Sequence, residues 1–329
     1  NKNIYSSSLN ISKSLNLLEE DHCLNIMPLF HIHGLIAIIA SSMKSGASVC
    51  ASNGFNALKF LELAKSEKIT WYSGVPTMHQ TIMLRAEKNL ELAKNLNLRL
   101  VRSSSASLPP AVFEKLNKVF NCPVIEAYGM TEATHQMTSN PLPPKKQKAG
   151  FVGIPAGPEV AIMNENNQIM KNGEVGEICI KGNNVTTGYE NNPEANKTSF
   201  SDGWFRTGDQ GFFDKDGYLK ISGRLKEIIN KGGEKISPLE VDNVLMDHPS
   251  IEQAVCFGYE DKMLGEDIAT AIILKEGVNF TETDLKVYAK EKLVKFKIPK
   301  KIFFVTEIPK GATGKLQRNV LAKKFGLDN

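Results

Sequence analysis

The sequence of 329 residues is poor in cysteine and in long apolar runs, and both shortages restrict what the protein can be. Its five cysteines are scattered along the chain, and none stands at the spacing of paired metal ligands. We therefore exclude a disulfide framework and a zinc site, and we expect reduced, buried thiols in an intracellular protein. No apolar run reaches the roughly 18 residues of a membrane helix, so we expect no membrane span.

The sequence also lacks an initial methionine and a signal-peptide pattern, since it begins at Asn1. We expect either a processed chain or a piece of a longer protein. There is no internal repeat, no low-complexity segment and no C-terminal Ser-Lys-Leu peroxisomal signal, so the cytoplasm is the compartment that we expect. Nothing in the sequence indicates the oligomeric state.

What is present is the composition of a globular protein, with 41% hydrophobic and 23% charged residues and a length suited to about two domains. The net charge of +4 hides a partition near the C-terminus. Residues 227–285 contain four basic and thirteen acidic side chains, whereas residues 286–324 contain twelve basic and two acidic ones. The basic segment is either a set of solvated lysine faces or a surface that attracts the phosphates of a nucleotide, of coenzyme A or of RNA.

The apolar patterning predicts an α/β protein. In residues 1–140, expected strands alternate with expected helices, which indicates a parallel or mixed sheet with helices on its faces. We predict helices at residues 9–18, 35–43, 55–67 and 109–120, and strands at residues 47–51, 69–75, 98–103 and 124–127. The segment 35–43 is apolar enough to form a buried helix.

The pattern changes after residue 140. Short apolar segments in residues 152–221, separated by Gly, Asn and Asp, predict a small β-barrel or a folded sheet. From residue 227 onward, strand and helix patterns return and predict a small α+β region. We predict helices there at residues 238–246 and 282–293, and strands at residues 251–258, 269–275 and 302–305.

The strongest local motif is Tyr-Gly-Met-Thr-Glu-Ala at residues 128–133, directly after a predicted strand. The hydroxyl of Thr131 beside the carboxylate of Glu132 suits a phosphate-bound Mg²⁺ ion, which prefers one or two carboxylates plus phosphate oxygens. Tyr128 beside Gly129 suits the stacking of a flat base. The alternative is a coincidental strand-to-loop turn.

Three further motifs contain residues suited to ligand binding. Asp209, in a predicted Gly-flanked turn, either accepts hydrogen bonds from ribose hydroxyls or is an ordinary turn aspartate. Gly232 and Gly233 either allow close approach of the backbone to a ligand or form a simple loop. Lys315 ends a glycine-rich loop, which suits a point charge delivered to a phosphate or carboxylate, although the spacing is not that of a Walker loop.

In this order and spacing, the motifs resemble those of the adenylate-forming superfamily, which contains acyl-CoA synthetases, luciferases and the adenylation domains of peptide synthetases. The resemblance covers nearly the whole chain, from Pro-Leu-Phe-His at residues 28–31 to residues 315–318. Residues 135–143 and the serine-rich residues 103–107 are most similar to the oxalate–CoA ligases.

The resemblance also implies how the chain is divided. It implies a large N-terminal domain in residues 1–225, with an α/β part (1–145) and a β-rich part (146–225). A small, mobile α+β domain follows in residues 226–329, with its hinge at Lys226.

The reaction implied by the resemblance has two steps and uses ATP, Mg²⁺ and coenzyme A. ATP and a carboxylate give an acyl adenylate and pyrophosphate, and the thiol of coenzyme A then displaces AMP. The residues implied to contact the nucleotide or Mg²⁺ are Glu126, Ala127, Tyr128, Gly129, Thr131, Glu132, Asp209 and Arg224. Tyr128 is implied to stack on adenine, Thr131 to contact phosphate and Glu132 to hold Mg²⁺.

The C-terminal domain is implied to move between the two steps. Lys315 is implied to approach the carboxylate and the bridging phosphate oxygen during adenylation, and to leave when the domain rotates about Lys226. Gly232 and Gly233 are then implied to line the pantetheine channel.

The positions implied to line the acyl pocket are His33, Ser104, Ser105, Thr134 and His135. A fatty tail would leave these polar groups unpaired, at about 1–3 kcal/mol each, whereas a second carboxylate would satisfy them, especially beside a protonated histidine. We therefore expect a very small dicarboxylic acid, with oxalate first and malonate next. The alternatives are that either histidine is a packed core residue, and that the substrate is another short or medium-chain acid. His31, in the Pro-Leu-Phe-His motif, is implied to lie near the pocket entrance, where we expect a gating role.

The superfamily's phosphate loop, which ends in Pro-Lys-Gly, is implied to lie upstream of Asn1. We therefore expect that roughly the first third of a typical member is absent and that adenylation by these residues alone is impaired. A non-catalytic nucleotide- or RNA-binding piece is a second hypothesis, although aromatic-rich RNA platforms and any dedicated nucleic-acid module are absent. A peptide-synthetase domain would need an adjacent carrier domain, and the polar pocket argues against the bulky aromatic substrate of a luciferase.

Overall fold

The computed structural model describes residues 1–327, and they form two compact units. The first unit contains residues 1–207 and 211–221, and the second contains residues 208–210 together with the chain from Ser222 onward. None of the helices within residues 1–327 is long and apolar enough to cross a membrane.

A seven-stranded sheet organises the first unit. In spatial order its strands are β2 (Ser48–Ala51), β1 (His22–Asn25), β3 (Trp71–Gly74), β4 (Leu100–Ser103), β5 (Val124–Met130), β6 (His135–Ser139) and β7 (Ile154–Pro155). The first five strands are parallel and the last two are antiparallel to their neighbours. The order 2-1-3-4-5 reverses between β1 and β3, and sheets of this kind bind ligands at the carboxyl ends of the strands beside the reversal.

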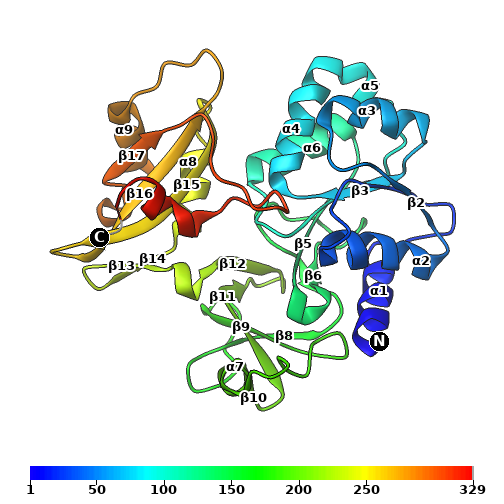
Figure 1. The fold of residues 1–329 in the computed structure, drawn as a ribbon, viewed down its shortest axis with the longest axis horizontal. Helices are drawn as coiled ribbons and strands as arrows, with labels where there is room; N and C mark the ends of the chain where they lie inside the picture. Colours follow the sequence, from blue (N-terminus) through cyan, green and yellow to red (C-terminus); the bar gives the residue numbers. More distant parts are fainter. Residues whose placement is uncertain (328–329) are drawn as a thin grey trace. The chain divides into compact units, whose positions relative to one another are not determined.

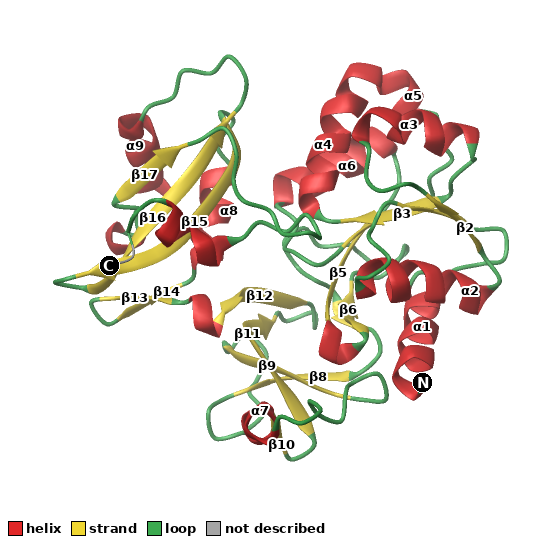
Figure 2. Cartoon of the chain, viewed as in Figure 1, coloured by secondary structure: helices red, strands yellow, loops and turns green. Residues whose placement is uncertain are grey.

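Helices cover both faces of this sheet (Figure 1, Figure 2). One layer contains α1 (Lys2–Ser14), the π-helix η1 (His33–Ala40) and α2 (Ser41–Ser45). The other contains α3 (Ala57–Ser66), α4 (Pro76–Ala86), η2 (Glu87–Asn89), α5 (Leu90–Lys94) and α6 (Pro110–Phe120). Strands β3 and β4 are buried along their whole length, as expected for parallel strands covered on both faces.

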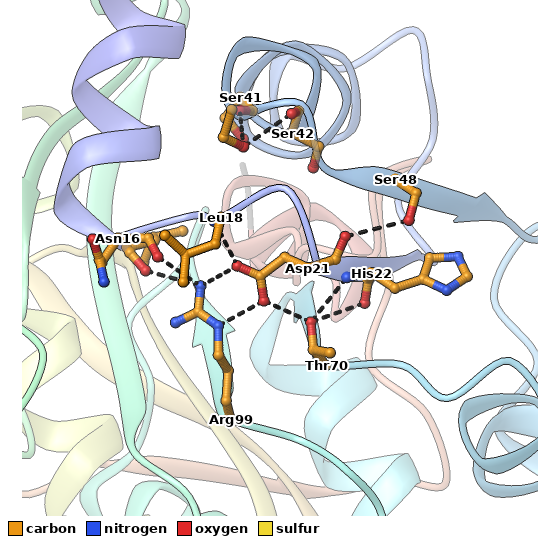
Figure 3. Close-up of polar contacts among 11 residues, drawn as sticks. Asn16, Leu18, Asp21, His22, Ser41, Ser42, Ser48, Thr70 and Arg99 are labelled. Carbon is orange, nitrogen blue, oxygen red and sulfur yellow. Dashed lines mark hydrogen bonds and ion pairs between the residues drawn. The ribbon is translucent and has the colours of Figure 1, made fainter.

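An ion pair between the buried Asp21 and the partly exposed Arg99 joins the chain that follows α1 to this sheet (Figure 3). Asp21 accepts hydrogen bonds from Nε and Nη2 of Arg99, both at 2.6 Å, from the Leu18 amide at 2.9 Å and from the Thr70 hydroxyl at 2.8 Å. Arg99 also donates to the carbonyl oxygens of Leu15 and Asn16. Burial opposes ionisation of Asp21, but the hydrogen bonds from Arg99, Leu18 and Thr70 hold its pKa below the usual value.

The β-rich part of the chain forms a five-stranded sheet. Its strands are β8 (Glu159–Met163), β9 (Gly176–Lys181), β10 (Phe200–Ser201), β11 (Trp204–Phe213) and β12 (Leu219–Arg224), paired in the order β10-β11-β9-β8 with β12 on β11. A short helix, α7 (Pro193–Ser199), precedes β10. The sheet packs an apolar cluster that includes Ile178, Phe205 and Leu219 and that also contains Tyr128 of β5 and Met137 of β6.

The second unit contains a further sheet, in which long β15 (Ile251–Asp261) and β16 (Gly265–Leu274) pair with each other. The remaining elements are η4 (Leu225–Glu227), β13 (Ile229–Lys231), β14 (Glu234–Ile236), α8 (Pro238–Met246), α9 (Glu282–Lys292), η5 (Lys295–Lys297), β17 (Lys301–Phe304), η6 (Arg318–Val320) and α10 (Leu321–Lys324). Successive residues of β15 enter two different apolar clusters, Cys256 with α8 and α9 and Phe257 with α10, as the two-residue period of a strand requires.

The charge partition of the sequence is explained by ion pairs within the second unit. Lys297 pairs with Glu240 at 2.7 Å, and Lys300 pairs with Asp261 at 2.8 Å. In the same way Lys286 and Arg318 pair with acidic residues of the preceding segment. Part of the basic segment therefore neutralises the acidic one, which weakens the argument for a free phosphate-binding surface.

Most predicted elements are confirmed to within a few residues, including the helices at 55–67, 109–120, 238–246 and 282–293. The predicted buried helix at 35–43 is present as η1 followed by α2, with Ile36, Ala37 and Ile38 buried. Only its two ends are exposed, Leu35 at 47% and Met43 at 73%. Helices α4, α5 and α7 were not predicted, and two of them begin with proline at the first helical position.

Candidate active site

His33 is positioned by a tight turn after β1 and is the first residue of η1. A Cβ atom at Gly34 would lie 2.4 Å from the carbonyl oxygen of Pro28, so only glycine allows the chain to fold this closely. The His33 amide donates to Nδ1 of His31 at 3.2 Å. Short π-helical segments are frequent at functional sites, and this one places His33 at the carboxyl ends of the parallel strands.

The His33 side chain is fully buried between two serines. Its Nε2 lies 2.6 Å from Oγ of Ser73, at the end of β3, and its Nδ1 lies 2.9 Å from Oγ of Ser105. Ser105 has a φ of +74°, a conformation that is uncommon for a residue with a side chain. The ring of His135 lies 5.3 Å from that of His33, measured between centroids. The predicted pocket residues His33, Ser105 and His135 are therefore brought together.

Gly129 permits the position of His135. A Cβ atom at Gly129 would lie 1.8 Å from the carbonyl oxygen of His135. Thr134 and His135 have φ values of +49° and +94°, so the chain enters β6 in a strained conformation. The glycine of the Tyr-Gly-Met motif thus serves the backbone of the pocket, a role that the sequence did not reveal.

The other two predicted pocket residues use their hydroxyls within the fold. Ser104 donates to the carbonyl oxygen of Ala127 at 2.8 Å, and Thr134 donates to that of Asn184 at 2.9 Å. Their contact with an acid stays a prediction.

Arg102 joins the same side-chain cluster, and sequence reasoning missed it. It lies in β4 opposite Ser73 of β3, and its side chain is fully buried. It donates to Oγ of Ser73 at 3.4 Å and to Oε1 of Gln136 at 3.2 Å, and its Nη2 lies 3.5 Å from Nδ1 of His135. Its place beside Ser103 at the end of a predicted strand was the available signal.

The residues predicted to contact the nucleotide base begin within β5. The prediction that residues 128–133 follow the strand was wrong, since β5 continues through Met130. The Glu126 carboxyl is buried, accepts the Leu108 amide with Oε1 at 2.8 Å and has no partner for Oε2 among the described residues. Burial raises the pKa of Glu126 to about 8, so it is mainly protonated at neutral pH. Tyr128 is buried in the β-rich cluster.

Thr131 and Glu132 lie in the short 3-10 helix η3 (Thr131–Ala133), which links β5 to β6. Oε1 of Glu132 accepts a hydrogen bond from the Tyr189 hydroxyl at 2.8 Å, a contact that the sequence did not predict. Removal from water and the bond to Glu132 raise the pKa of Tyr189 to about 12, so the phenol stays a donor. Residues 1–327 contain no cluster of three or more metal-ligating side chains. One partly exposed carboxylate fits Mg²⁺ held mainly by phosphate oxygens.

Asp209 and Arg224 form an ion pair in the second unit. Asp209 is 5% exposed, and its Oδ1 accepts Nε of Arg224 at 2.7 Å. The prediction that Asp209 lies in a turn was wrong, because it lies within the ten-residue strand β11, next to Gly208 with a φ of +71°. The pair is arranged so that Arg224 orients the Asp209 carboxylate.

The Lys315 loop is closed by backbone hydrogen bonds. The Gly311 amide donates to the Lys315 carbonyl at 2.8 Å, and Gly314 turns the chain with a φ of +80°. Partial removal from water lowers the pKa of Lys315, and Arg224 lowers it further, while Asp209 opposes this. The lysine therefore lies in the electrostatic field of the Asp209–Arg224 pair.

The remaining predicted residues lie near the start of the second unit. Lys226 is exposed in η4. Gly232 and Gly233 join β13 to β14, with φ values of +60° and +93°. A two-residue hairpin with positive φ at both positions is a type I′ turn, which explains the glycines structurally. Their contact with pantetheine stays a prediction.

Comparison with known proteins gives consistent results. The family model described as AMP-binding enzyme matches residues 1–190, and that described as AMP-binding enzyme C-terminal domain matches residues 240–315. Oxalate–CoA ligases of Arabidopsis thaliana and Saccharomyces cerevisiae are 49% and 47% identical to the chain. The matches cover 98% of the chain in both cases, and 63% and 59% of the relatives.

Among solved structures, ATP-bound MatB from Rhodopseudomonas palustris is similar, with a TM-score of 0.92 and 29% identity over 98% of this chain and 64% of that one. The chain thus spans about three fifths of the length of these proteins. The likeness confirms the mixed α/β fold. Because the first family model alone matches more than half of the residues, the chain belongs to the family of AMP-binding, or adenylate-forming, enzymes.

Proposed function

We propose that the protein containing these residues is an AMP-forming acid–thiol ligase that converts a very small dicarboxylic acid, oxalate first, into its acyl-CoA. The observation that carries this proposal is the buried cluster of His33, Ser105 and His135, with Arg102 behind it. The names of the two oxalate–CoA ligases similar to the chain support the same substrate.

The composition of the pocket favours a dianion over a fatty acid. His33 and His135 are both almost completely buried, and Ser73 and Ser105 flank the first of them. An alkyl chain inserted here would separate these groups from their partners, and each buried polar group left unsatisfied costs about 1–3 kcal/mol. The two carboxylates of oxalate accept hydrogen bonds on all four oxygens, so one can react while the other is bound.

In the first step, a substrate carboxylate oxygen attacks the α-phosphorus of ATP and pyrophosphate leaves. Tyr128, Ala127 and Gly129 would contact the adenine, and Glu126, held neutral by burial, would add a polar edge. Thr131 would contact phosphate and Glu132 would supply one oxygen ligand to Mg²⁺, which neutralises phosphate charge when bound.

Asp209 would bind the ribose hydroxyls, with Arg224 orienting its carboxylate. Lys315 would stabilise the charge that develops between the acyl carboxylate and the phosphate, because a compact ammonium acts as a point charge. Burial and Arg224 lower the pKa of Lys315, whereas a carboxylate and a phosphate beside it would favour its charged form.

In the second step, the thiolate of coenzyme A attacks the acyl carbon and AMP leaves. We propose that residues after Lys226 rotate between the steps, which removes Lys315 and brings Gly232 and Gly233 toward the pantetheine. The type I′ turn presents two residues without side chains, which suits close passage of a narrow ligand.

The test is acid-dependent ATP–pyrophosphate exchange by the complete encoded protein, with oxalate, malonate, acetate and octanoate. We expect exchange to be fastest with oxalate, and a Lys315→Ala variant to lose at least about 100-fold of it. Lys310→Ala, in the same loop, is the matched control and should retain activity. Faster exchange with octanoate than with oxalate would refute the substrate, and absence of exchange with every acid would refute the enzyme class.

A further inference from the structure

Arg102 carries a buried charge that the described protein does not neutralise. Its side chain is fully buried, and none of the ion pairs formed by residues 1–327 includes it. Burial lowers its pKa to about 9, which still leaves it protonated at neutral pH. Its Nε has no hydrogen-bond partner among the described residues. A buried cation without an anion is costly, so its retention calls for a compensating anion.

Two hydrogen-bond chains lead from Arg102 to the pocket. In the first, Nη1 donates to Oγ of Ser73, which lies 2.6 Å from Nε2 of His33, and Nδ1 of His33 lies 2.9 Å from Oγ of Ser105. In the second, Nη2 lies 3.5 Å from Nδ1 of His135. Both chains begin on the same guanidinium and end on residues that the proposed function assigns to the substrate.

The guanidinium gives both chains a direction, because arginine only donates hydrogen bonds. Ser73 accepts from Arg102 and keeps its own hydroxyl proton available for Nε2 of His33. In the His33 tautomer that accepts this proton, Nδ1 is protonated and donates to Ser105. Likewise, Nδ1 of His135 accepts from Arg102, so Nε2 carries the proton.

We propose that Arg102 is a positioning residue that makes this adenylate-forming enzyme select acids with a second negative charge. It acts without touching the acid, by orienting Ser105 and His135 as donors and by supplying the positive charge that a second carboxylate neutralises. This inference rests on the proposed function, since it concerns the acyl pocket of the same enzyme.

The charge and the orientation predict different results for different acids. A monocarboxylate places one charge at the reacting end and needs nothing at the far end of the pocket. A dicarboxylate places its second charge beside the ends of the two chains. Loss of Arg102 should therefore reduce kcat/KM for oxalate about 30-fold or more, and that for acetate by less than about threefold.

The experiment compares kcat/KM for oxalate, malonate and acetate in the complete protein and in Arg102→Gln, Arg102→Lys and Gln136→Glu. Arg102→Lys keeps the charge but loses the forked donors, so the ratio of oxalate to acetate should fall only in part. Gln136→Glu keeps Arg102 but replaces the amide whose Oε1 now accepts from Nη2 at 3.2 Å by a carboxylate. This carboxylate would neutralise Arg102 in place of the substrate, so the ratio of oxalate to acetate should fall here too. Ser103→Ala, on the same strand, is the matched control and should leave the ratio unchanged.

The outcomes separate the two proposals. An equal fall in kcat/KM for all three acids in Arg102→Gln and Gln136→Glu would overturn the role of Arg102 while leaving the ligase activity intact. A wild-type protein active only on monocarboxylates would overturn both. If Arg102→Gln does not fold, Arg102→Lys and Gln136→Glu decide the question. Oxalate binding, measured by calorimetry, should weaken in parallel with kcat/KM. A purely structural defect would not weaken binding once the signal is corrected for the amount of folded protein.

Discussion

Two arginines three residues apart serve opposite purposes. Arg99 stands just before β4 and shares a two-pronged ion pair with Asp21, whereas Arg102 within β4 meets only neutral partners. The better-buried arginine is the one without a counterion, since Arg102 is fully buried and the Arg99 side chain is 30% exposed. The fold itself supplies the counterion of Arg99, whereas the described residues supply none for Arg102, and we propose that the substrate does so.

The same contrast extends to neighbouring residues. Asp21 receives hydrogen bonds at both carboxylate oxygens, and its pKa is held low despite burial. Glu126, on the strand next to β4, receives one, and burial raises its pKa to about 8. Glu126 avoids its burial cost by taking up a proton, an option that arginine lacks at neutral pH.

The largest effect on stability is expected at the Asp21–Arg99 pair. Asp21→Asn removes the charge opposite Arg99 and should lower the free energy of unfolding by about 3–5 kcal/mol, as when one member of a buried pair is lost. Because the pKa of Asp21 is lowered in the fold, its stabilisation is complete above the ordinary carboxyl pKa and declines as the pH falls below it. Denaturant unfolding at several pH values measures this.

The control for Asp21→Asn is Glu87→Gln, which breaks the exposed pair with Lys115 and should change stability by less than about 1 kcal/mol. Equal effects of the two substitutions would remove the distinction between a structural pair and a surface one.

The next largest effect is expected at Gly129, on the pocket side of the comparison. Gly129→Ala forces the His135 carbonyl to move and should cost about 3 kcal/mol, with loss of oxalate-dependent activity even in the folded fraction. Gly173→Ala is a control for alanine at a glycine with open space around it, although its φ of +91° adds some strain. Retention of full activity by Gly129→Ala would contradict the role assigned to this close contact.

The contrast between the two arginines marks what sequence reasoning could predict. The period of the apolar residues predicted the helices and strands around both arginines, because burial of one face imposes the same apolar pattern on every such element. Resemblance to a family predicted His33, Ser105 and His135 as pocket residues from motifs far apart in the chain, and the fold brings their side chains together. Helix α4 was missed because Pro76 looks like the end of a strand and is also the first residue of a helix.

Arg102 and Gly129 escaped notice for a physical reason. The register that places Arg102 beside Ser73, and the distance that forbids a side chain at Gly129, exist only once strands from distant segments are paired. The same holds for Asp21 and Arg99, 78 residues apart. Hydrophobic period predicts an element, but not which polar side chains it brings together.

A comparable effect that depends on pH is expected from Glu126→Gln. With its pKa raised to about 8 in the fold, Glu126 favours folding fully only below its ordinary pKa, and this contribution is lost as the pH rises toward 8. Wild-type stability relative to the variant should therefore fall by roughly 3 kcal/mol between about pH 5 and pH 8. Glu114→Gln, at an exposed position on α6, is the control. A difference that does not depend on pH would mean that Glu126 is ionised in the fold.

The smallest effect on stability is expected from Arg102→Met. This variant also separates the role of Arg102 from that of Arg99 most clearly. Methionine removes an unneutralised buried charge, which favours folding, and leaves Oε1 of Gln136 without its donor, which opposes it. These changes should cancel to within about 1 kcal/mol, while Arg99→Met should lose about 3 kcal/mol, because it strands the Asp21 carboxylate. Parallel denaturant unfolding of the two variants makes the measurement at one pH. Equal losses at both positions would show that Arg102 supports the fold as Arg99 does. Near-constant stability with a lost preference for oxalate would show that this charge is held in place for the substrate.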